Sequence, residues 1–272
     1  MVPVRCRAVS ADPVVRVRRE PPAFRPLRVV STEARTPYLV RVTLRADWLS
    51  EFEAPSPGGS VRLLLPERPG AEPLMPVWNG NAFFHTDGRR PLVRTLTPLR
   101  HDPDAGELDV EAVLHGEAPL SRWADGARPG DRVALSGPGR GYAFKDGVTA
   151  YLIAGDESAI PAIGQLLDAL PAGAQATVIV EIAHLEARHP LTDRRDVDVR
   201  WVDRPADGRP GAALVPAVVE ADIEAGTRLW VAGEAAAMQA IRRYLFEDRG
   251  LARADATVRG YWKDGSASSG DD

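Results

Sequence analysis

The stretch AYLIAGDESAIPAIGQLLDAL, residues 150–170, sets the character of the second half of the chain. Its first five residues are apolar and predict a buried strand over 150–154. A polar turn follows, and the residues after it predict a helix over 158–170. The apolar side chains of this helix recur at spacings of three and four: Ile160, Ile163, Leu167 and Leu170. A buried strand that leads through a short turn into an amphipathic helix is typical of an α/β domain.

The same alternation continues toward the end of the chain. Further strands are predicted over 176–183, 197–202, 229–232 and 257–262. A second helix is predicted over 235–248, where apolar residues share one face. Strands that alternate with helices imply a doubly wound, mostly parallel sheet with helices on its faces.

The first half has a different pattern. Apolar residues recur at every second position over 38–44 and over 108–114, as in half-buried antiparallel strands. Short strands are also predicted over 61–65 and 131–136, between breaks rich in Pro and Gly. Many short strands with turn signals between them predict a sandwich or a small barrel.

The change of pattern near residues 143–148 predicts a domain boundary. We expect one domain over 1–146 and a second over 147–265. The small, polar residues 266–272 predict a disordered tail.

Composition excludes several classes of protein. The 272 residues are 44% hydrophobic and 26% charged, as in a globular protein, and the net charge of −4 argues against a nucleic-acid partner. Cys6 is the single cysteine, so neither an internal disulfide nor a cysteine-based metal cluster can form, and we predict no metal site. No apolar run resembles a secretory signal or a membrane span, so we expect a cytoplasmic protein without stable membrane association.

The segment LVRTLTPLR, residues 92–100, brings two arginines and two threonines together: Arg94, Thr95, Thr97 and Arg100. Arginine grips phosphate with a two-pronged fork, and threonine hydroxyls add hydrogen bonds, so a cradle for a phosphate-bearing ligand is one interpretation. The other interpretation is a solvated strand and turn.

The segment VLHGEAPLSRWADGARPGD, residues 113–131, ends a strand at His115-Gly116 and predicts a helix that starts at Ser121 and contains Trp123. Backbone amides at a helix start bind pyrophosphate. Alternatively, Ser121 caps the helix and His115 is structural.

Two strands of the second half end in polar residues, at AGDES (154–158) and at WVAGE (230–234). Open α/β sheets bind ligands outside the carboxyl ends of their strands. The sequence is not GxGxxG, and Asp156 or Ser158 as a helix cap is the alternative. The segment RGYWKDG (259–265) adds an aromatic pair beside Lys263, which packing alone could also explain.

Taken in order, these motifs resemble the siderophore-interacting flavoproteins, the FAD-dependent ferric-siderophore reductases of the ferredoxin-reductase-like superfamily. The resemblance extends from about residue 25 to 265 and rests on RTLTPLRHDPDAGELDVEAVLHG, PLSRWADGARPGDRVALSGPG, LIAGDESAIPAIGQLLDALPAGA, WVAGE and RGYWKDG. It implies a six-stranded antiparallel Greek-key barrel that binds FAD, followed by an α/β domain that receives NADPH or NADH.

The resemblance also implies roles for single residues. In the barrel, Arg94 would contact the phosphate side of the flavin and Thr97 would lie near the isoalloxazine ring, with Thr95 and Leu96 between them. The segment over the pyrophosphate and adenine is matched by His115, Gly116, Pro119, Ser121, Arg122 and Trp123. The stretches that face the nicotinamide cofactor are matched by Gly155, Asp156, Glu157, Ser158, Gly233 and Glu234. Tyr261 would lie near the flavin, and the expected catalytic residues are Thr97, Trp262 and Lys263.

The chain departs from the family motif at two positions. Leu96 stands where the family has a tyrosine that packs against the flavin ring, and Leu99 stands where a second arginine is usual. Both departures bear on how tightly FAD is held. One alternative is therefore a degenerate relative that binds a siderophore or another ligand without reducing it, and another is a ferredoxin-reductase-like oxidoreductase with a different acceptor.

The expected substrate is an anionic ferric siderophore, drawn to the flavin edge by Lys263 and more weakly by Arg259. The electron donor stays open. Glu181 would favour NADH through a ribose contact, Arg188 would favour NADPH through its 2′-phosphate, and reduced ferredoxin is a third donor. The sequence does not identify the siderophore or the oligomeric state.

Overall fold

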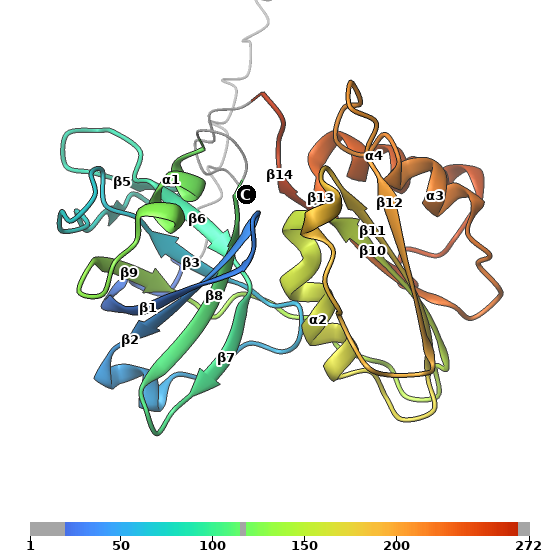
Figure 1. Ribbon diagram of the computed structural model, residues 1–272, viewed down its shortest axis with the longest axis horizontal. Coiled ribbons are helices and arrows are strands. Elements are labelled where there is room, and N and C mark those ends of the chain that lie inside the picture. Colours follow the sequence, from blue (N-terminus) through green and yellow to red (C-terminus); the bar gives the residue numbers. More distant parts are fainter. Residues whose placement is uncertain (1–19, 115–117, 266–272) are drawn as a thin grey trace, which may run out of the picture.

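The computed structural model of the protein describes residues 20–114 and 118–265. His115, Gly116 and the expected tail over 266–272 lie outside the described residues. The described chain folds into an antiparallel sheet followed by a parallel α/β sheet, which lie side by side (Figure 1). This confirms the fold class predicted from the sequence.

The first sheet has seven strands, and every pairing within it is antiparallel. In chain order the strands are β1 (Arg25–Thr36), β2 (Leu39–Arg45), β3 (Val61–Leu64), β6 (Val93–Leu96), β7 (Pro98–Asp102), β8 (Glu107–Val113) and β9 (Arg132–Ser136). Their order in the sheet is β6-β3-β9-β1-β2-β8-β7. The last strand thus returns to lie between β1 and β3, which is the long connection of a Greek key.

The two edges of this sheet are consecutive in the chain. Only Thr97 separates β6, which pairs with β3, from β7, which pairs with β8. Pro98 has no amide hydrogen, so a regular ladder cannot continue through it. One bent strand therefore joins both edges and curls the sheet into a barrel, and counting β6 and β7 as that strand gives the predicted six.

The alternating apolar residues of these strands fill the barrel. Strand β2 places Val40, Val42 and Leu44 inside, where they pack with residues such as Leu63 and Leu135. Smaller elements surround the barrel: the 3-10 helix η1 (Asp47–Glu51), the hairpin β4 (Val77–Trp78) and β5 (Phe83–Phe84), and the helix α1 (Pro119–Gly126).

The second sheet has five parallel strands: β10 (Ala150–Asp156), β11 (Gln175–Ile182), β12 (Val197–Asp203), β13 (Arg228–Glu234) and β14 (Ala256–Trp262). Their order is β12-β11-β10-β13-β14, so the strand order reverses beside β10. The connecting elements are η2 (Glu157–Ala159), α2 (Ile160–Asp168), η3 (Leu185–Ala187), α3 (Leu214–Glu220), α4 (Ala235–Arg243) and the π-helical η4 (Tyr244–Asp248).

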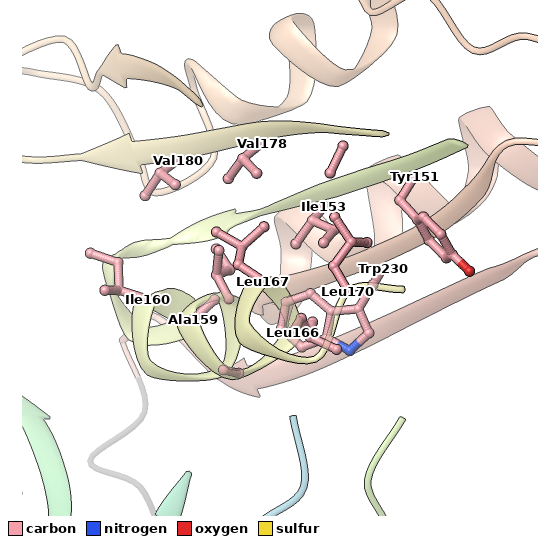
Figure 2. Packing of buried hydrophobic residues seen from close by; sticks show 14 of the residues in the cluster. Tyr151, Ile153, Ala159, Ile160, Leu166, Leu167, Leu170, Val178, Val180 and Trp230 are labelled. Atoms are coloured by element: carbon pink, nitrogen blue, oxygen red, sulfur yellow. The ribbon is translucent and has the colours of Figure 1, made fainter. Parts of the chain in front are cut away.

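Helices cover both faces of the parallel sheet, as predicted. On one face, α2 packs Ile160, Leu166 and Leu167 against the central strands (Figure 2). On the other face, α3 and α4 pack Leu214, Val218, Met238 and Ile241 against the same strands. Burial on both faces explains why the strands are nearly continuous apolar runs.

Helix α2 also lies against the barrel (Figure 1). The Gln165 side chain accepts a hydrogen bond from the Gly58 amide (3.0 Å) and donates one to the Pro98 carbonyl. On another part of the boundary, the Tyr38 and His184 rings stack with their centroids 4.2 Å apart. The two sheets are therefore held together by polar and aromatic contacts.

Candidate functional site

A small, partly open cleft lies where the barrel meets the carboxyl ends of the parallel strands. Its lining comprises Val113, Asp156, Glu157, Ser158, Glu181, Ala183, Arg204 and Trp262. Val113 ends barrel strand β8, whereas the others lie at or just beyond the carboxyl ends of strands of the second sheet. Since ligands of open α/β sheets bind where the strand order reverses, this cleft is the candidate site.

Asp156 organises the centre of the cleft. It ends β10, and its carboxylate accepts hydrogen bonds from the Trp262 Nε1 (2.9 Å) and the Glu234 amide (2.8 Å). It also accepts from the Ser158 amide (2.9 Å), so it caps η2, as the alternative interpretation predicted. Burial raises the pKa of Asp156, and these hydrogen bonds oppose that shift.

Gly233 and Glu234 hold the neighbouring strand end in place. A Cβ on Gly233 would lie 2.6 Å from Asp156 Oδ2, so only glycine lets that carboxylate approach. The Glu234 carboxylate accepts from the amides of Ala236 (2.6 Å) and Ala237 (3.0 Å) at the start of α4. Its other oxygen accepts from the Asp264 amide, which ties down the C-terminal segment.

Two expectations about the nucleotide donor change with the structure. Glu181 is 1% exposed, and its carboxylate accepts hydrogen bonds from the amides of Gly211, Ala213 and Leu214 at the start of α3. The interpretation of Glu181 as a ribose ligand is therefore wrong. Arg188 donates to Asp203 Oδ1 at 2.6 Å, so its guanidinium is already engaged.

The two arginines of residues 92–100 have different surroundings. Arg100 donates to Asp109 (3.0 Å) and Glu107 (2.9 Å), which raise its pKa, so it is a structural residue between β7 and β8. Arg94 donates to the Val93 carbonyl (2.7 Å) and has no acidic partner among the described residues. Burial lowers the pKa of Arg94. A desolvated cation without a counter-ion fits the phosphate group of FAD.

Helix α1 begins at Pro119, two residues before the predicted start. Its N-cap residue, Ala118, has no side chain that could accept from the first amides, and Ser121 instead donates to the Val113 carbonyl (3.3 Å). Ser121 is thus not the helix cap. The Nε1 of Trp123 is buried, and no described residue accepts its hydrogen bond. These features also fit a polar ligand beside α1.

Thr97, at the edge of the barrel, meets the C-terminal segment of the parallel sheet. A side-chain hydrogen bond joins Thr97 to the Tyr261 hydroxyl, and burial raises the pKa of Tyr261 to about 12. Tyr261 also packs edge-on against Trp230, with ring centroids 6.2 Å apart. Leu96 is 9% exposed and packs in the barrel core, so it offers no stacking surface to a flavin ring. Thr95, which precedes Leu96, is exposed.

The two cations expected at the flavin edge also differ. Lys263 is exposed and follows Trp262 of the cleft. Arg259 donates to the backbone carbonyls of Gly58 (3.1 Å), Arg140 (3.2 Å) and Gly141 (3.2 Å). Its guanidinium therefore ties β14 to the barrel loops instead of attracting a substrate, which corrects the expectation for Arg259.

Sequence reasoning missed three lining residues of the cleft: Val113, Ala183 and Arg204. Ala183 ends a predicted strand and Arg204 follows one, so the rule that ligands bind at carboxyl ends of strands could have found both. No group of acidic, His or Cys side chains in the described chain is placed to hold a metal ion. None of its helices has the length and hydropathy needed to cross a bilayer.

The barrel, the parallel sheet and the cleft between them define a ferredoxin-reductase-like fold. A solved ferredoxin reductase of carbazole 1,9a-dioxygenase shares this fold, with a TM-score of 0.62 and 16% identity over 92% of this chain and 71% of that one. Residues 28–142 match the model of the siderophore-interacting FAD-binding domain, and residues 148–265 match that of the siderophore-interacting protein. The chain belongs to the siderophore-interacting protein family.

Individual relatives agree with this assignment. The uncharacterized protein Rv2895c of Mycobacterium tuberculosis is 35% identical, over 89% of this chain and 92% of its own. The ferric vibriobactin reductase ViuB of Vibrio cholerae is 28% identical, over 84% of each chain. A solved siderophore utilization protein from T. fusca is 31% identical, with a TM-score of 0.79 over 91% of this chain and 95% of that one.

Proposed function

We propose that the protein is a cytoplasmic, FAD-dependent reductase that transfers electrons from NADPH or NADH to a ferric siderophore. Two relatives support this proposal by name, the ferric vibriobactin reductase of Vibrio cholerae and a ferric acinetobactin reductase of Acinetobacter baumannii. The observation that carries it is the cleft in which barrel residue Val113 meets Asp156 and Trp262 of the parallel sheet. A hydride donor and its acceptor must lie within about 3.5 Å, so both must bind where the two domains meet.

The barrel residues would hold the cofactor. Arg94 supplies an unneutralised guanidinium for a phosphate, and α1 presents first-turn amides that Ala118 cannot cap. Thr97 lies at the boundary with the second domain and orients the Tyr261 hydroxyl. Bound FAD would accept two electrons from the nicotinamide donor and pass them one at a time to iron.

The second domain would receive the nicotinamide donor. Glycine at position 233 lets Asp156 reach the Trp262 indole and the Glu234 amide, and this arrangement fixes the strand ends that form the cleft. We therefore assign Asp156 and Glu234 to positioning rather than to contact with the reacting atoms. Gly155, Glu157 and Ser158 complete the same strand-to-helix turn.

The substrate would approach the exposed rim that carries Lys263. An ammonium group there attracts an anionic ferric complex. One nicotinamide supplies two electrons and therefore reduces two ferric ions, with release of one proton. Siderophore oxygens hold Fe(III), a hard ion, more firmly than Fe(II), so reduction loosens the metal.

A second candidate, a siderophore-binding protein with little flavin, is favoured by the burial of Leu96 in the barrel core. The visible absorption spectrum of the purified protein separates the two. The reductase requires bound FAD, bleaching of that flavin by NADPH or NADH, and Fe(II) formation from a ferric siderophore. A colourless protein that gains no FAD on reconstitution overturns the reductase proposal, and bleaching without ferric reduction points to another acceptor.

A further inference from the structure

Lys263 lies between two residues that are held by buried acids. Before it, the Trp262 Nε1 donates to Asp156 (2.9 Å). After it, the backbone amide of Asp264 donates to Glu234 (3.2 Å). The two acids end the neighbouring strands β10 and β13 and are 7% and 4% exposed. The chain on both sides of Lys263 is therefore tied to the parallel sheet.

A β-bulge brings the C-terminal segment to these acids. Strand β14 pairs with β13 in regular register until Glu234, which lies opposite Trp262 instead of Tyr261. Tyr261 is thus an extra residue on β14. A bulge redirects the side chains that follow it and is common beside active sites. Here it places Trp262 at the strand end where its indole reaches Asp156.

Both carboxylates are occupied by donors of the protein itself. Asp156 accepts from Trp262, from the Glu234 amide, and from the amide (2.9 Å) and hydroxyl (2.5 Å) of Ser158. Glu234 accepts from two amides of the first turn of α4 as well as from Asp264. A carboxylate has about four acceptor positions, so Asp156 is saturated and Glu234 nearly so. Both acids therefore act on the segment that they hold and not on a ligand.

This arrangement bears on the exposed Lys263 side chain, which follows Trp262 of the cleft. A lysine ammonium is a point charge on a flexible stem, so its reach is set by the position of its backbone. Its attraction for an anion is screened over about 8 Å at physiological ionic strength, which makes that position important.

We propose that Glu234 is a positioning residue for the substrate. By holding the Asp264 amide, it keeps the Lys263 ammonium at the rim of the cleft, where the ammonium binds an anionic ferric siderophore. This inference rests on the proposed function, because it concerns the ferric substrate of the same cleft. It makes an acid promote the binding of an anion, which is the opposite of the acid's direct electrostatic effect.

The first test changes the acceptor. In Glu234→Gln, the one carbonyl oxygen serves the two α4 amides, so the NH2 group faces the Asp264 amide and their hydrogen bond is lost. Loss of the negative charge alone would strengthen anion binding. We instead expect the Kd for a ferric tris-catecholate, an anion, to rise about twofold to fivefold, the range of one exposed charge pair. Glu247→Gln in η4 makes the same charge change and should not weaken binding.

The Kd is measured by quenching of tryptophan fluorescence on the oxidised, flavin-loaded protein without an electron donor. A ferric tris-hydroxamate, which is neutral, serves as the second probe. It lacks the charge that the ammonium attracts, so its Kd should rise less than that of the anion.

A second pair of variants removes the donor and leaves Glu234 unchanged. Asp264→Pro lacks the amide hydrogen, and proline is favoured before a glycine of positive φ in a type II turn, as Gly265 is at 71°. Asp264→Asn removes the same charge but keeps the amide. The proline variant should weaken binding of the tris-catecholate as Glu234→Gln does, and the asparagine variant should not.

Lys263→Gln shows whether Glu234 acts through the ammonium. If it does, the double variant Glu234→Gln with Lys263→Gln binds the tris-catecholate no more weakly than Lys263→Gln alone, because both changes remove one interaction. Additive losses, an equal loss for the neutral probe, wild-type affinity in Lys263→Gln, or unchanged binding in both Glu234→Gln and Asp264→Pro overturns the positioning role.

The proposed function is judged separately. It stands after any of those outcomes if the wild type reduces the bound ferric complexes with NADPH or NADH. A wild type that binds them without reducing them overturns the reductase, while the binding data still decide the role of Glu234. Failure of the wild type to bind either ferric complex overturns both.

Discussion

Replacing Gly155 with alanine should strain the strand end on which the cleft is built. A Cβ at this position would lie 2.5 Å from the Ala159 Cβ and 2.6 Å from the Ala232 carbonyl oxygen. Carbon atoms normally approach to about 3.5–4.0 Å, so the overlap is about 1 Å or more. The Ala232 oxygen belongs to the paired strand β13, opposite Gly155 in the register, and cannot rotate away.

Overpacking of this kind costs about 1–3 kcal/mol, which we expect as the loss in free energy of unfolding. The measurement is urea denaturation followed by tryptophan fluorescence, with the midpoint and slope fitted for each variant. Gly164→Ala is the matched control, because nothing lies within 4 Å of its added Cβ and alanine favours the α2 helix by up to about 1 kcal/mol.

The two substitutions therefore have opposite expected signs, although each adds one methyl group to the same strand–helix unit. Gly155→Ala should also disturb Asp156, the next residue, and change the near-ultraviolet circular dichroism of its partner Trp262. An alanine at position 155 that is as stable as one at 164 would contradict the close approach of β10 to β13 described above.

Three further changes probe other parts of the structure. Arg94→Gln removes a desolvated charge, so the flavin-free protein should be as stable or more stable by urea denaturation, while fluorescence titration should show FAD affinity about tenfold or more weaker; unchanged affinity would exclude Arg94 from the cofactor site. Gln165→Leu leaves an amide and a carbonyl of the barrel without their partner and should lower the free energy of unfolding by about 1–3 kcal/mol; no loss in urea denaturation would count against this tie between the domains. Burial raises the pKa of Tyr261 to about 12, so its contribution to stability is complete below pH 10 and is lost as the pH rises toward 12. The stability difference between wild type and Tyr261→Phe should therefore shrink over that window, and a constant difference would refute the assignment.

The architecture could be predicted because it is encoded locally. Apolar residues alternate over 38–44 and recur at spacings of three and four after Ser158. Each pattern identifies one buried face of a strand or helix, and it can be recognised from residues that are close in the sequence. The sequence did not predict that the strand bends at Thr97. The bend arises because β6, before Thr97, pairs with β3, whereas β7, after it, pairs with β8.

The site was harder to predict, since its chemistry depends on which polar groups are already engaged. Glu181 and Arg259 have the residue types and positions of ligand-binding groups, yet the folded chain uses both for its own backbone groups. Arg94 and Arg100 are equivalent in the sequence, and only the acids on β8 distinguish them. Tertiary contacts, invisible in a single sequence, therefore decided which candidates stayed available.

The boundary between the domains is recognised largely through main-chain atoms. Gln165 and Arg259, both from the second domain, bind the amide of Gly58 and the carbonyls of Pro98, Gly58, Arg140 and Gly141 in the barrel loops. Every residue type presents the same carbonyl, so these loops can change composition without disturbing the join, provided that their path is kept. Chimeras that exchange whole barrels between relatives are thus compatible with these contacts. The sequences of the two halves can therefore change independently of each other.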